Sequence, residues 1–363
     1  MKKTLLLTIN FLVYQFCSAT QLLVPSQYPT IQGAINAAVT GDTVMVTPNS
    51  TYVENIIFMG KDIVVTTPNP ATDRYTTFID GSGAALSTVR FVDMETNAAQ
   101  LVGFTIKNGT GTLRSWWYYL GFNIIAGGGI HIDSPSAFNQ GAPSTGSSPT
   151  LNFLIVENNT ASMGGGICSW RQCRPIIKNT IVRNNKAFDL AGGIFIIEAF
   201  SYGVNYVYFE NLEVTHNDCT GTVGGGGIVA NYSSDVIMKH CTVANNTSSF
   251  PAGENMFRAN GAIFLIYNSI IQTGSADLLD NQGGTLYQSE LHHSCVSNFN
   301  GPITSVIGNI TTSPDFVNQT IGDYHLQTTS GYATTDLIVT CGCKPGYGCF
   351  RSCWRSTRHC IRL

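Results

Sequence analysis

Short segments that share one pattern of apolar and polar positions recur through the middle of the chain. Each alternates apolar with polar or small residues and ends in Asn-Asn, or in one copy His-Asn. The four clearest copies are Asn152–Asn159, Lys178–Asn185, Glu210–Asn217 and Lys239–Asn246. Between them lie glycine runs that lead into apolar segments, so each unit reads as strand, asparagine turn, glycine run and strand. Alternation with period two is typical of β-strands.

Aligning the four copies predicts which side chains face the interior, because successive residues of a strand point to opposite faces. The predicted inward set is Leu154, Val156, Thr180, Val182, Leu212, Val214, Cys241 and Val243. The predicted outward set is Ile155, Glu157, Ile181, Arg183, Glu213, Thr215, Thr242 and Ala244. The two sets separate by polarity only imperfectly, since Ile155 and Ile181 fall outside.

One such unit cannot bury its own apolar face, whereas stacked units form a continuous core. We therefore expect an all-β fold, a right-handed parallel β-helix (solenoid) with a short N-terminal capping helix. The helix is predicted within Pro29–Ala38, where Ile31, Ala34, Ile35 and Ala38 have the spacing of one helical face. Asparagines suit the turns because they tolerate a left-handed backbone. Those one coil apart can stack as an amide ladder.

Composition narrows the class of protein further. Hydrophobic residues make up 43% of the 363 residues and charged residues only 11%, so the chain is too apolar to be disordered. The net charge of −3 argues against a nucleic-acid partner. No zinc spacing, calcium cluster or nucleotide motif stands out, so we expect no metal and no cofactor. His292 and His293 read as an exposed pair in a loop.

The two ends of the chain differ from its middle. Lys2 and Lys3 precede an apolar run and small residues up to Ala19, which is the pattern of a signal peptide. We expect a signal peptide at 1–19, a β-helix domain at 20–335 and a basic, cysteine-rich tail at 336–363. The tail resembles part of an EGF-like module. The protein is then secreted or displayed on the extracellular surface, with no transmembrane segment.

Secretion permits disulfide bonds and glycans. Cys168 and Cys173 are the pair that we expect to be bridged, whereas Cys241 is expected to be a small core residue. The candidate glycosylation sites, all in Asn-x-Ser/Thr sequences, are Asn49, Asn108, Asn158, Asn231, Asn245, Asn246, Asn309 and Asn318.

The motifs carry a resemblance that covers about residues 22 to 330. The opening, from Tyr28 to Gly81, looks like that of right-handed parallel β-helix proteins of the pectin-lyase-like superfamily. The Asn-Asn and Gly-Gly-Gly-Ile units resemble the repeats of polymorphic outer-membrane proteins. The resemblance implies a fold but no single activity, because this fold hosts lyases, hydrolases, esterases, adhesins and structural proteins.

Catalytic motifs of these enzymes are not recognisable. Pectinesterases share the opening, but their later catalytic motifs have no counterpart, and the polygalacturonase motifs are missing. The nearest constellation is Glu157, Arg183 and Glu213, which we expect on three successive coils. A second charged column is Lys178, Glu210 and Lys239. Both favour an alternating-charge ladder on a solvated face over a catalytic site.

An aromatic cluster, Trp116, Trp117, Tyr118 and Tyr119, lies in an apparent insertion at residues 110 to 126. Its rings either stack on sugar rings or are buried by a loop folded back on the rod. We therefore expect a structural, adhesive or glycan-binding role, with a polysaccharide or cell-surface glycan as partner. The alternative is a polysaccharide lyase or glycoside hydrolase that acts on acidic polysaccharide.

Overall fold

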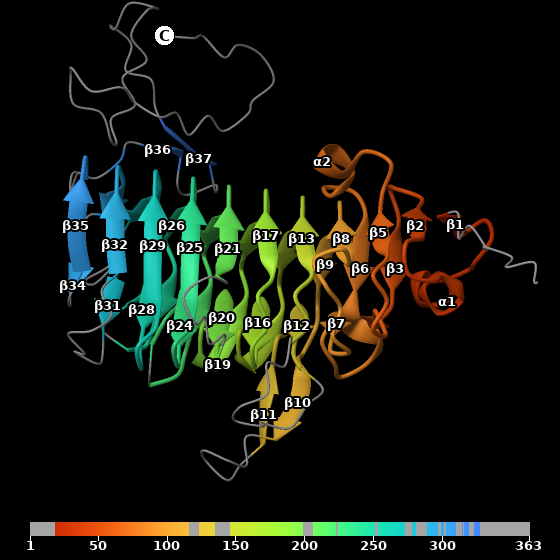
Figure 1. Ribbon diagram of the computed structural model, residues 1–363, viewed down its shortest axis with the longest axis horizontal. Helices are drawn as coiled ribbons and strands as arrows, with labels where there is room; N and C mark the ends of the chain where they lie inside the picture. Colours follow the sequence, from red (N-terminus) through yellow and green to blue (C-terminus); the bar gives the residue numbers. More distant parts are fainter. Residues whose placement is uncertain are drawn as a thin grey trace, which may run out of the picture.

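Parallel strands stack side by side along one long axis and build a β-helix (Figure 1). The computed structural model describes residues 19–115, 123–134, 146–198, 206–222, 224–250, 253–272, 278–280, 289–296, 299–300, 303–309, 314, 316–318 and 323–326. Four sheets run along the rod, and we name them A to D. The expected fold class, an all-β parallel β-helix with a short N-terminal helix, is confirmed.

The elements have the following bounds. Sheet A holds β1 (Gln21–Val24), β2 (Thr43–Val46), β5 (Val64–Thr66), β8 (Gln100–Val102), β13 (Thr150–Asn152), β17 (Ile176–Lys178), β21 (Val207–Glu210), β25 (Asp235–Lys239), β29 (Ile263–Tyr267), β32 (Ser289–His292) and β35 (Ile303–Ile307). Sheet B holds β3 (Thr51–Val53), β6 (Phe78–Asp80), β9 (Thr105–Lys107), β14 (Ile155–Glu157), β18 (Ile181–Arg183), β22 (Glu213–Thr215), β26 (Thr242–Ala244), β30 (Ile270–Gln272) and β33 (Cys295–Val296). Sheet C holds β4 (Ile56–Ile57), β7 (Val89–Phe91), β12 (Ile130–Ile132), β16 (Ile167–Trp170), β20 (Ile194–Ile197), β24 (Ile228–Asn231), β28 (Met256–Arg258), β31 (Leu278–Asp280) and β34 (Phe299–Asn300). Sheet D holds β10 (Thr112–Ser115), β11 (Asn123–Ala126), β15 (Thr160–Met163), β19 (Lys186–Leu190), β23 (Asp218–Cys219) and β27 (Thr247–Ser248). The remaining elements are α1 (Ile31–Ala37), α2 (Pro70–Asp73), the 3₁₀ turn η1 (Gly81–Gly83) and the hairpin of β36 (Phe316–Asn318) and β37 (Asp323–Leu326).

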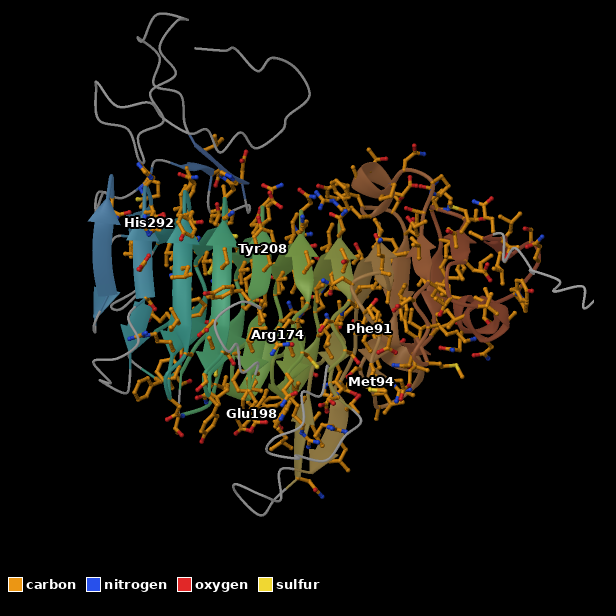
Figure 2. All side chains as sticks on the ribbon, in the orientation of Figure 1. Phe91, Met94, Arg174, Glu198, Tyr208 and His292 are labelled. Carbon is orange, nitrogen blue, oxygen red and sulfur yellow. The ribbon has the colours of Figure 1, made fainter. Side chains whose placement is uncertain are left out.

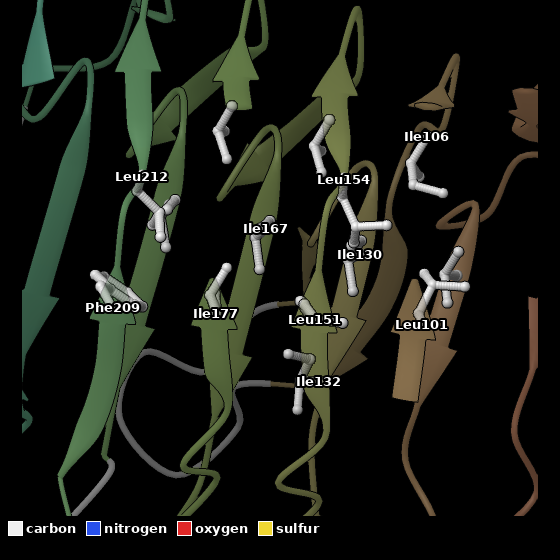
Figure 3. Packing of buried hydrophobic residues seen from close by; sticks show 14 of the residues in the cluster. Leu101, Ile106, Ile130, Ile132, Leu151, Leu154, Ile167, Ile177, Phe209 and Leu212 are labelled. Atoms are coloured by element: carbon white, nitrogen blue, oxygen red, sulfur yellow. The ribbon is translucent and has the colours of Figure 1, made fainter. Parts of the chain in front are cut away.

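The aligned valines form a single buried column, as the sequence predicts. Val156 pairs in register with Val182, and Val214 with both Val182 and Val243. All four are fully buried. The second predicted inward set, which includes Leu154 and Leu212, is buried as well, and Figure 3 shows these leucines within the core. The central prediction about the fold is thus confirmed.

Each repeat segment is two strands rather than one, which the sequence did not reveal. In the first copy the chain bends at Phe153, between β13 of sheet A and β14 of sheet B. Phe153 has a positive φ of 51°, and Asn179, Asn211 and His240 occupy the same bend in later coils with φ between 48° and 57°. A left-handed residue turns the chain sharply, and asparagine tolerates it best.

An additional strand also follows each asparagine turn. Sheet D side chains such as Met163 and Leu190 pack with Cys168, Phe195 and Val229 in a second apolar cluster. The glycine run comes next and returns the chain to sheet C. Gly164 has a φ of 64°, and a Cβ on Gly166 would lie 2.7 Å from the carbonyl oxygen of Gly193. This close approach explains why side chains are missing from the run.

The predicted amide ladder is present and is formed by the second asparagine of each pair. The Nδ2 of Asn159 donates to Asn185 Oδ1 at 3.0 Å, and the ladder continues through Asn217 and Asn246 to Asn255. These asparagines are buried. The first residue of each pair makes the left-handed turn, with φ between 52° and 56° at Asn158, Asn184, His216 and Asn245.

The helix α1 packs at the N-terminal end of the rod, where the sequence predicted it. Its four expected apolar residues, Ile31, Ala34, Ile35 and Ala38, are buried. Glu54 accepts hydrogen bonds from the backbone N–H groups of Ile31 and Gln32, both at 2.9 Å. A carboxylate at this end satisfies N–H groups that have no partner inside the helix.

Some predicted outward residues are buried, because other segments cover them. The hairpin of β36 and β37 packs on sheet B through Phe316 and Tyr324, which contact Ala244. Ile155 and its neighbour in the outward column, Thr105, are also buried. The next residue of the column, Ile181, is half-buried. The Thr105 hydroxyl donates to the carbonyl oxygen of Arg74, so the segment after α2 lies over this column.

The expected bridge between Cys168 and Cys173 is wrong. Both thiols are free, and they belong to different clusters: Cys168 faces sheet D, whereas Cys173 lies in the main core. Cys241 is a buried core residue, as expected. Residues 1–18 of the predicted signal peptide and the whole tail 336–363 lie outside the described residues. Within the described part, no helix has the length and apolar character needed to cross a membrane.

Candidate ligand-binding face on sheet A

The outward face of sheet A carries two parallel rows of side chains along the rod axis. The first row, read from β17 to β32, is Ile176, Tyr208, Ile237, Leu265 and Glu290. The second row is Lys178, Glu210, Lys239, Tyr267 and His292. All ten are half-buried, so they lie on an accessible surface. Figure 2 labels Tyr208 on β21 and His292 on β32.

Cations and aromatic rings alternate along this face, and we call the five residues Lys178, Tyr208, Lys239, Tyr267 and His292 the cation–aromatic ladder. The Nζ atoms of Lys178 and Lys239 lie 5.4 Å and 5.5 Å from the Tyr208 ring centroid. Lys239 Nζ is also 5.9 Å from the centre of the Tyr267 ring. Tyr267 stacks on His292 with a centroid separation of 4.6 Å and an interplanar angle of 19°.

Two carboxylates balance the charges of the ladder. Glu210 Oε2 lies 3.2 Å from Lys178 Nζ, which confirms the alternating-charge interpretation of this column. Glu290 Oε2 lies 3.0 Å from His292 Nε2. Burial, and then the charge of Glu210, raises the pKa of Tyr208; burial and Glu290 do the same for Tyr267. Both phenols therefore stay protonated at neutral pH and can donate hydrogen bonds to a ligand.

The predicted constellation on sheet B does not converge. Arg183 Nε donates to Glu157 Oε2 at 2.8 Å, so these two form the expected ion pair. Glu213, however, is in register with Ile181 rather than with Arg183, whose partner on β22 is Thr215. The three residues therefore lie on three successive strands, β14, β18 and β22, as expected, but Glu213 stands in a different column from Glu157 and Arg183. The pair is an element of a charge ladder, as the sequence favoured.

A second group of polar residues is buried at the ends of the sheet C strands. Asp133 forms an ion pair with Arg114 of β10 and lies 3.5 Å from His131 Nε2. Burial acts to raise the pKa of Asp133, but His131 and Arg114 outweigh it and hold this pKa below its usual value. The ion pair fastens the hairpin of β10 and β11 to sheet C.

Glu198 follows β20 and is 2% exposed, with a left-handed φ of 56°. Burial raises its pKa to about 7, although Arg171 acts in the opposite direction. Because Asp133 and Glu198 are both buried, this cluster offers no accessible surface to a polymer. Among the described residues, no group of His, Cys, Asp and Glu side chains is arranged to hold a metal ion.

The insertion predicted at residues 110 to 126 is a hairpin of β10 and β11 that projects from the rod (Figure 1). Trp116, Trp117, Tyr118 and Tyr119 lie in its connection, outside the described residues. Sequence reasoning also missed the aromatic members of the ladder. His292 was expected in a loop, but it ends strand β32 and contacts Tyr267.

A signal for these residues exists in the sequence. Tyr267 and His292 each precede an Asn or His, as Lys239 precedes His240, and they thereby mark two degenerate copies of the repeat. Aligning these copies would have placed both rings in the column of Lys178 and Glu210.

Comparison with known proteins adds a fold likeness. A scan against protein-family models gave no match, and no curated protein sequence matched either. Among solved structures, the chain is similar to the pectin methylesterase from Aspergillus niger, with a TM-score of 0.44 and 11% sequence identity. The likeness covers 80% of this chain and 90% of the esterase.

Proposed function

We propose that the protein is an extracellular β-helix that binds glycan chains through the cation–aromatic ladder on sheet A, in a structural or adhesive role. The observation that carries the proposal is the continuity of the ladder over five successive strands, β17, β21, β25, β29 and β32. A purely structural column needs only contacts between neighbours. This one also leaves two tyrosines, Tyr208 and Tyr267, half-buried on the outward face of the sheet.

The chemistry of the face supports a sugar ligand. Sugar rings have apolar C–H faces that pack on aromatic rings, and their hydroxyl groups accept and donate hydrogen bonds. Tyr208 and Tyr267 supply rings together with phenolic donors. Lys178, Lys239 and Glu210 supply charged hydrogen-bonding groups beside them. Ligand sites commonly combine apolar surface with a few such polar groups.

Strand spacing sets the geometry of binding. Neighbouring strands of a sheet are about 4.8 Å apart, so Tyr208 and Tyr267, which are two strands apart, are offset by about 10 Å along the axis. A chain that lies along the rod would pass Tyr208 on β21 and Tyr267 on β29, which stand in the two neighbouring rows. The proposal therefore includes a linear polymer as the ligand, with its long axis parallel to that of the rod.

A glycan array followed by affinity measurement tests the proposal. We expect wild-type protein to bind linear oligosaccharides and Tyr208→Ala to lose at least about tenfold in affinity, because one stacking ring is removed. Tyr75→Ala is the matched control, since Tyr75 is an exposed tyrosine beside α2 and outside the ladder. Unchanged binding by Tyr208→Ala would exclude the cation–aromatic ladder as the glycan-binding surface.

The aromatic cluster of Trp116, Trp117, Tyr118 and Tyr119 is a second candidate contact for the same ligand. Replacing Trp116 and Trp117 together by alanine should weaken the array signals if the cluster takes part. The comparison with Tyr208→Ala then tells which of the two regions binds. Cleavage of acidic polysaccharide, the alternative activity, has less support, since Glu157 and Glu213 lie in different columns.

A further inference from the structure

We infer that the ladder takes an uncharged glycan chain rather than an acidic one. The inference rests on the proposed function and adds the chemical class of the ligand. It follows from three features of the face: how its cations are paired, which side chains flank the ladder, and where its one remaining ammonium group lies.

The first feature is that most positive charge on the face is already compensated. The Lys178 ammonium lies 3.2 Å from a Glu210 carboxylate oxygen, and His292 lies 3.0 Å from Glu290. The two rows hold two lysines and two glutamates, so the charges of these four residues cancel. An acidic polymer gains affinity from uncompensated cations, as polyanion-binding surfaces do. An acidic polymer on this face would also meet the carboxylates of Glu210 and Glu290.

The second feature is the apolar row beside the ladder. Ile176, Ile237 and Leu265 are in register with Tyr208 and are half-buried, so their exposed sides form a flat apolar strip. A neutral sugar ring places C–H groups on such a strip. A uronic acid or sulfated sugar would bring a charged group close to it, and partial desolvation of a charge without a partner is costly.

The third feature is the position of Lys239. Its ammonium lies between the Tyr208 and Tyr267 rings, at 5.5 Å and 5.9 Å from their centroids. In this position the charge is stabilised by two ring faces. A single ammonium group that is held in this way can donate to a hydroxyl group as readily as to a carboxylate, so it does not by itself select an acidic ligand.

The test compares matched pairs of linear oligosaccharides of equal length, measured by titration calorimetry. The pairs are β-1,4-glucan with β-1,4-glucuronan, β-1,4-mannan with β-1,4-mannuronan, and carboxyl-reduced with native α-1,4-galacturonan. The members of each pair differ only in the group at C6. We expect the neutral member of the best-binding pair to bind about tenfold more tightly than the acidic one.

Salt and two variants complete the design. Binding of the neutral chain should change little between low and high NaCl, because screening acts on charges. Tyr267→Ala should lose at least about tenfold in affinity. Lys239→Gln, which removes a charge but keeps a hydrogen-bond donor, should reduce the affinity of the acidic member of a pair more than that of the neutral member. Urea midpoints for both variants, compared with wild type, show that the fold is retained.

The outcomes separate the inference from the function on which it rests. Tighter binding of the acidic member, with loss of affinity in salt and in Lys239→Gln, would overturn the neutral ligand and leave glycan binding intact. If no member of any pair binds, or if Tyr208→Ala and Tyr267→Ala both bind as wild type does, the ladder is not a glycan site and both proposals fall.

Discussion

The Asn185 side chain donates from Nδ2 to Oδ1 of Asn217 at 3.0 Å, one coil further along the rod. The same Oδ1 also accepts the backbone N–H of Asn185 at 3.1 Å. Each amide in the ladder therefore ties two coils together through both side chain and backbone. Because the residues are buried, these hydrogen bonds are shielded from competition by water.

Replacing Asn217 by alanine should destabilise the protein by about 3 kcal/mol or more. Asn217 Nδ2 donates to Val182 O, Thr215 O and Asn246 Oδ1, and its removal leaves several buried groups without partners. Urea denaturation followed by circular dichroism measures the loss. Asn97→Ala is the control, since Asn97 is exposed, and it should change stability by less than about 0.5 kcal/mol. Equal effects of the two substitutions would contradict a stabilising role of the asparagine amide ladder.

The repeated core could be predicted because the same local pattern is copied from coil to coil. Val156, Val182, Val214 and Val243 occur at one position of an alternating segment, and alternation fixes the face to which they point. The asparagine ladder follows from the same alignment, since identical side chains one coil apart must meet once the valines are in register. The helix α1 could be predicted for a comparable reason, because its four apolar residues have helical spacing.

The features that could not be predicted depend on contacts between distant segments. Ala244 belongs to an outward row, and it is buried in a cluster with Phe316 and Tyr324 of the distant hairpin. The bend at Phe153 could not be predicted, because phenylalanine does not favour the left-handed conformation that it adopts here. The cation–aromatic ladder on sheet A could not be predicted, because its tyrosines occur in different rows and belong to different copies of the repeat.

The cysteines provide a test of the corrected thiol assignment. Cys168, Cys173, Cys219, Cys241 and Cys295 are free and buried. We therefore expect native protein to react slowly at these sites with a thiol reagent, and at least these five thiols to become reactive in denaturant without reductant. Peptide mapping of the labelled protein identifies them. Protection of Cys168 and Cys173 in denaturant, reversed by reductant, would restore the bridge between them.

Burial should decide which of the eight Asn-x-Ser/Thr sequences can carry a glycan in a host that glycosylates secreted proteins. Asn49, Asn108, Asn158 and Asn318 are exposed. Asn108 Nδ2 donates to Asp80, so the other three are the ones expected to be occupied. Asn246 is 3% exposed, and its Nδ2 donates to Asn255 Oδ1 within the ladder, so a glycan there would exclude the native packing. Mass spectrometry of glycopeptides from folded, secreted protein measures occupancy. Substantial occupancy of Asn246 would show that the asparagine amide ladder does not include this residue.

Stability should fall as pH rises through 7, because of Glu198. Its pKa is raised from the ordinary glutamate value of 4.5 to about 7 in the folded protein, mainly by burial. The native state thus binds the proton more tightly than the unfolded state does. The resulting stabilisation is complete below about pH 4.5 and is lost as pH rises through 7. A shift of this size corresponds to about 3 kcal/mol.

The variant Glu198→Gln isolates this contribution, since glutamine keeps the shape and hydrogen-bonding capacity of the protonated acid. The difference in unfolding free energy between wild type and variant should change by up to about 3 kcal/mol between pH 5 and pH 8, in the direction that favours the variant at high pH. Other groups cancel in the difference: His216, whose pKa is lowered by burial, has the opposite dependence in both proteins. Urea midpoints across this range measure the effect. Parallel pH profiles of wild type and variant would show that Glu198 is ionised in the folded protein throughout.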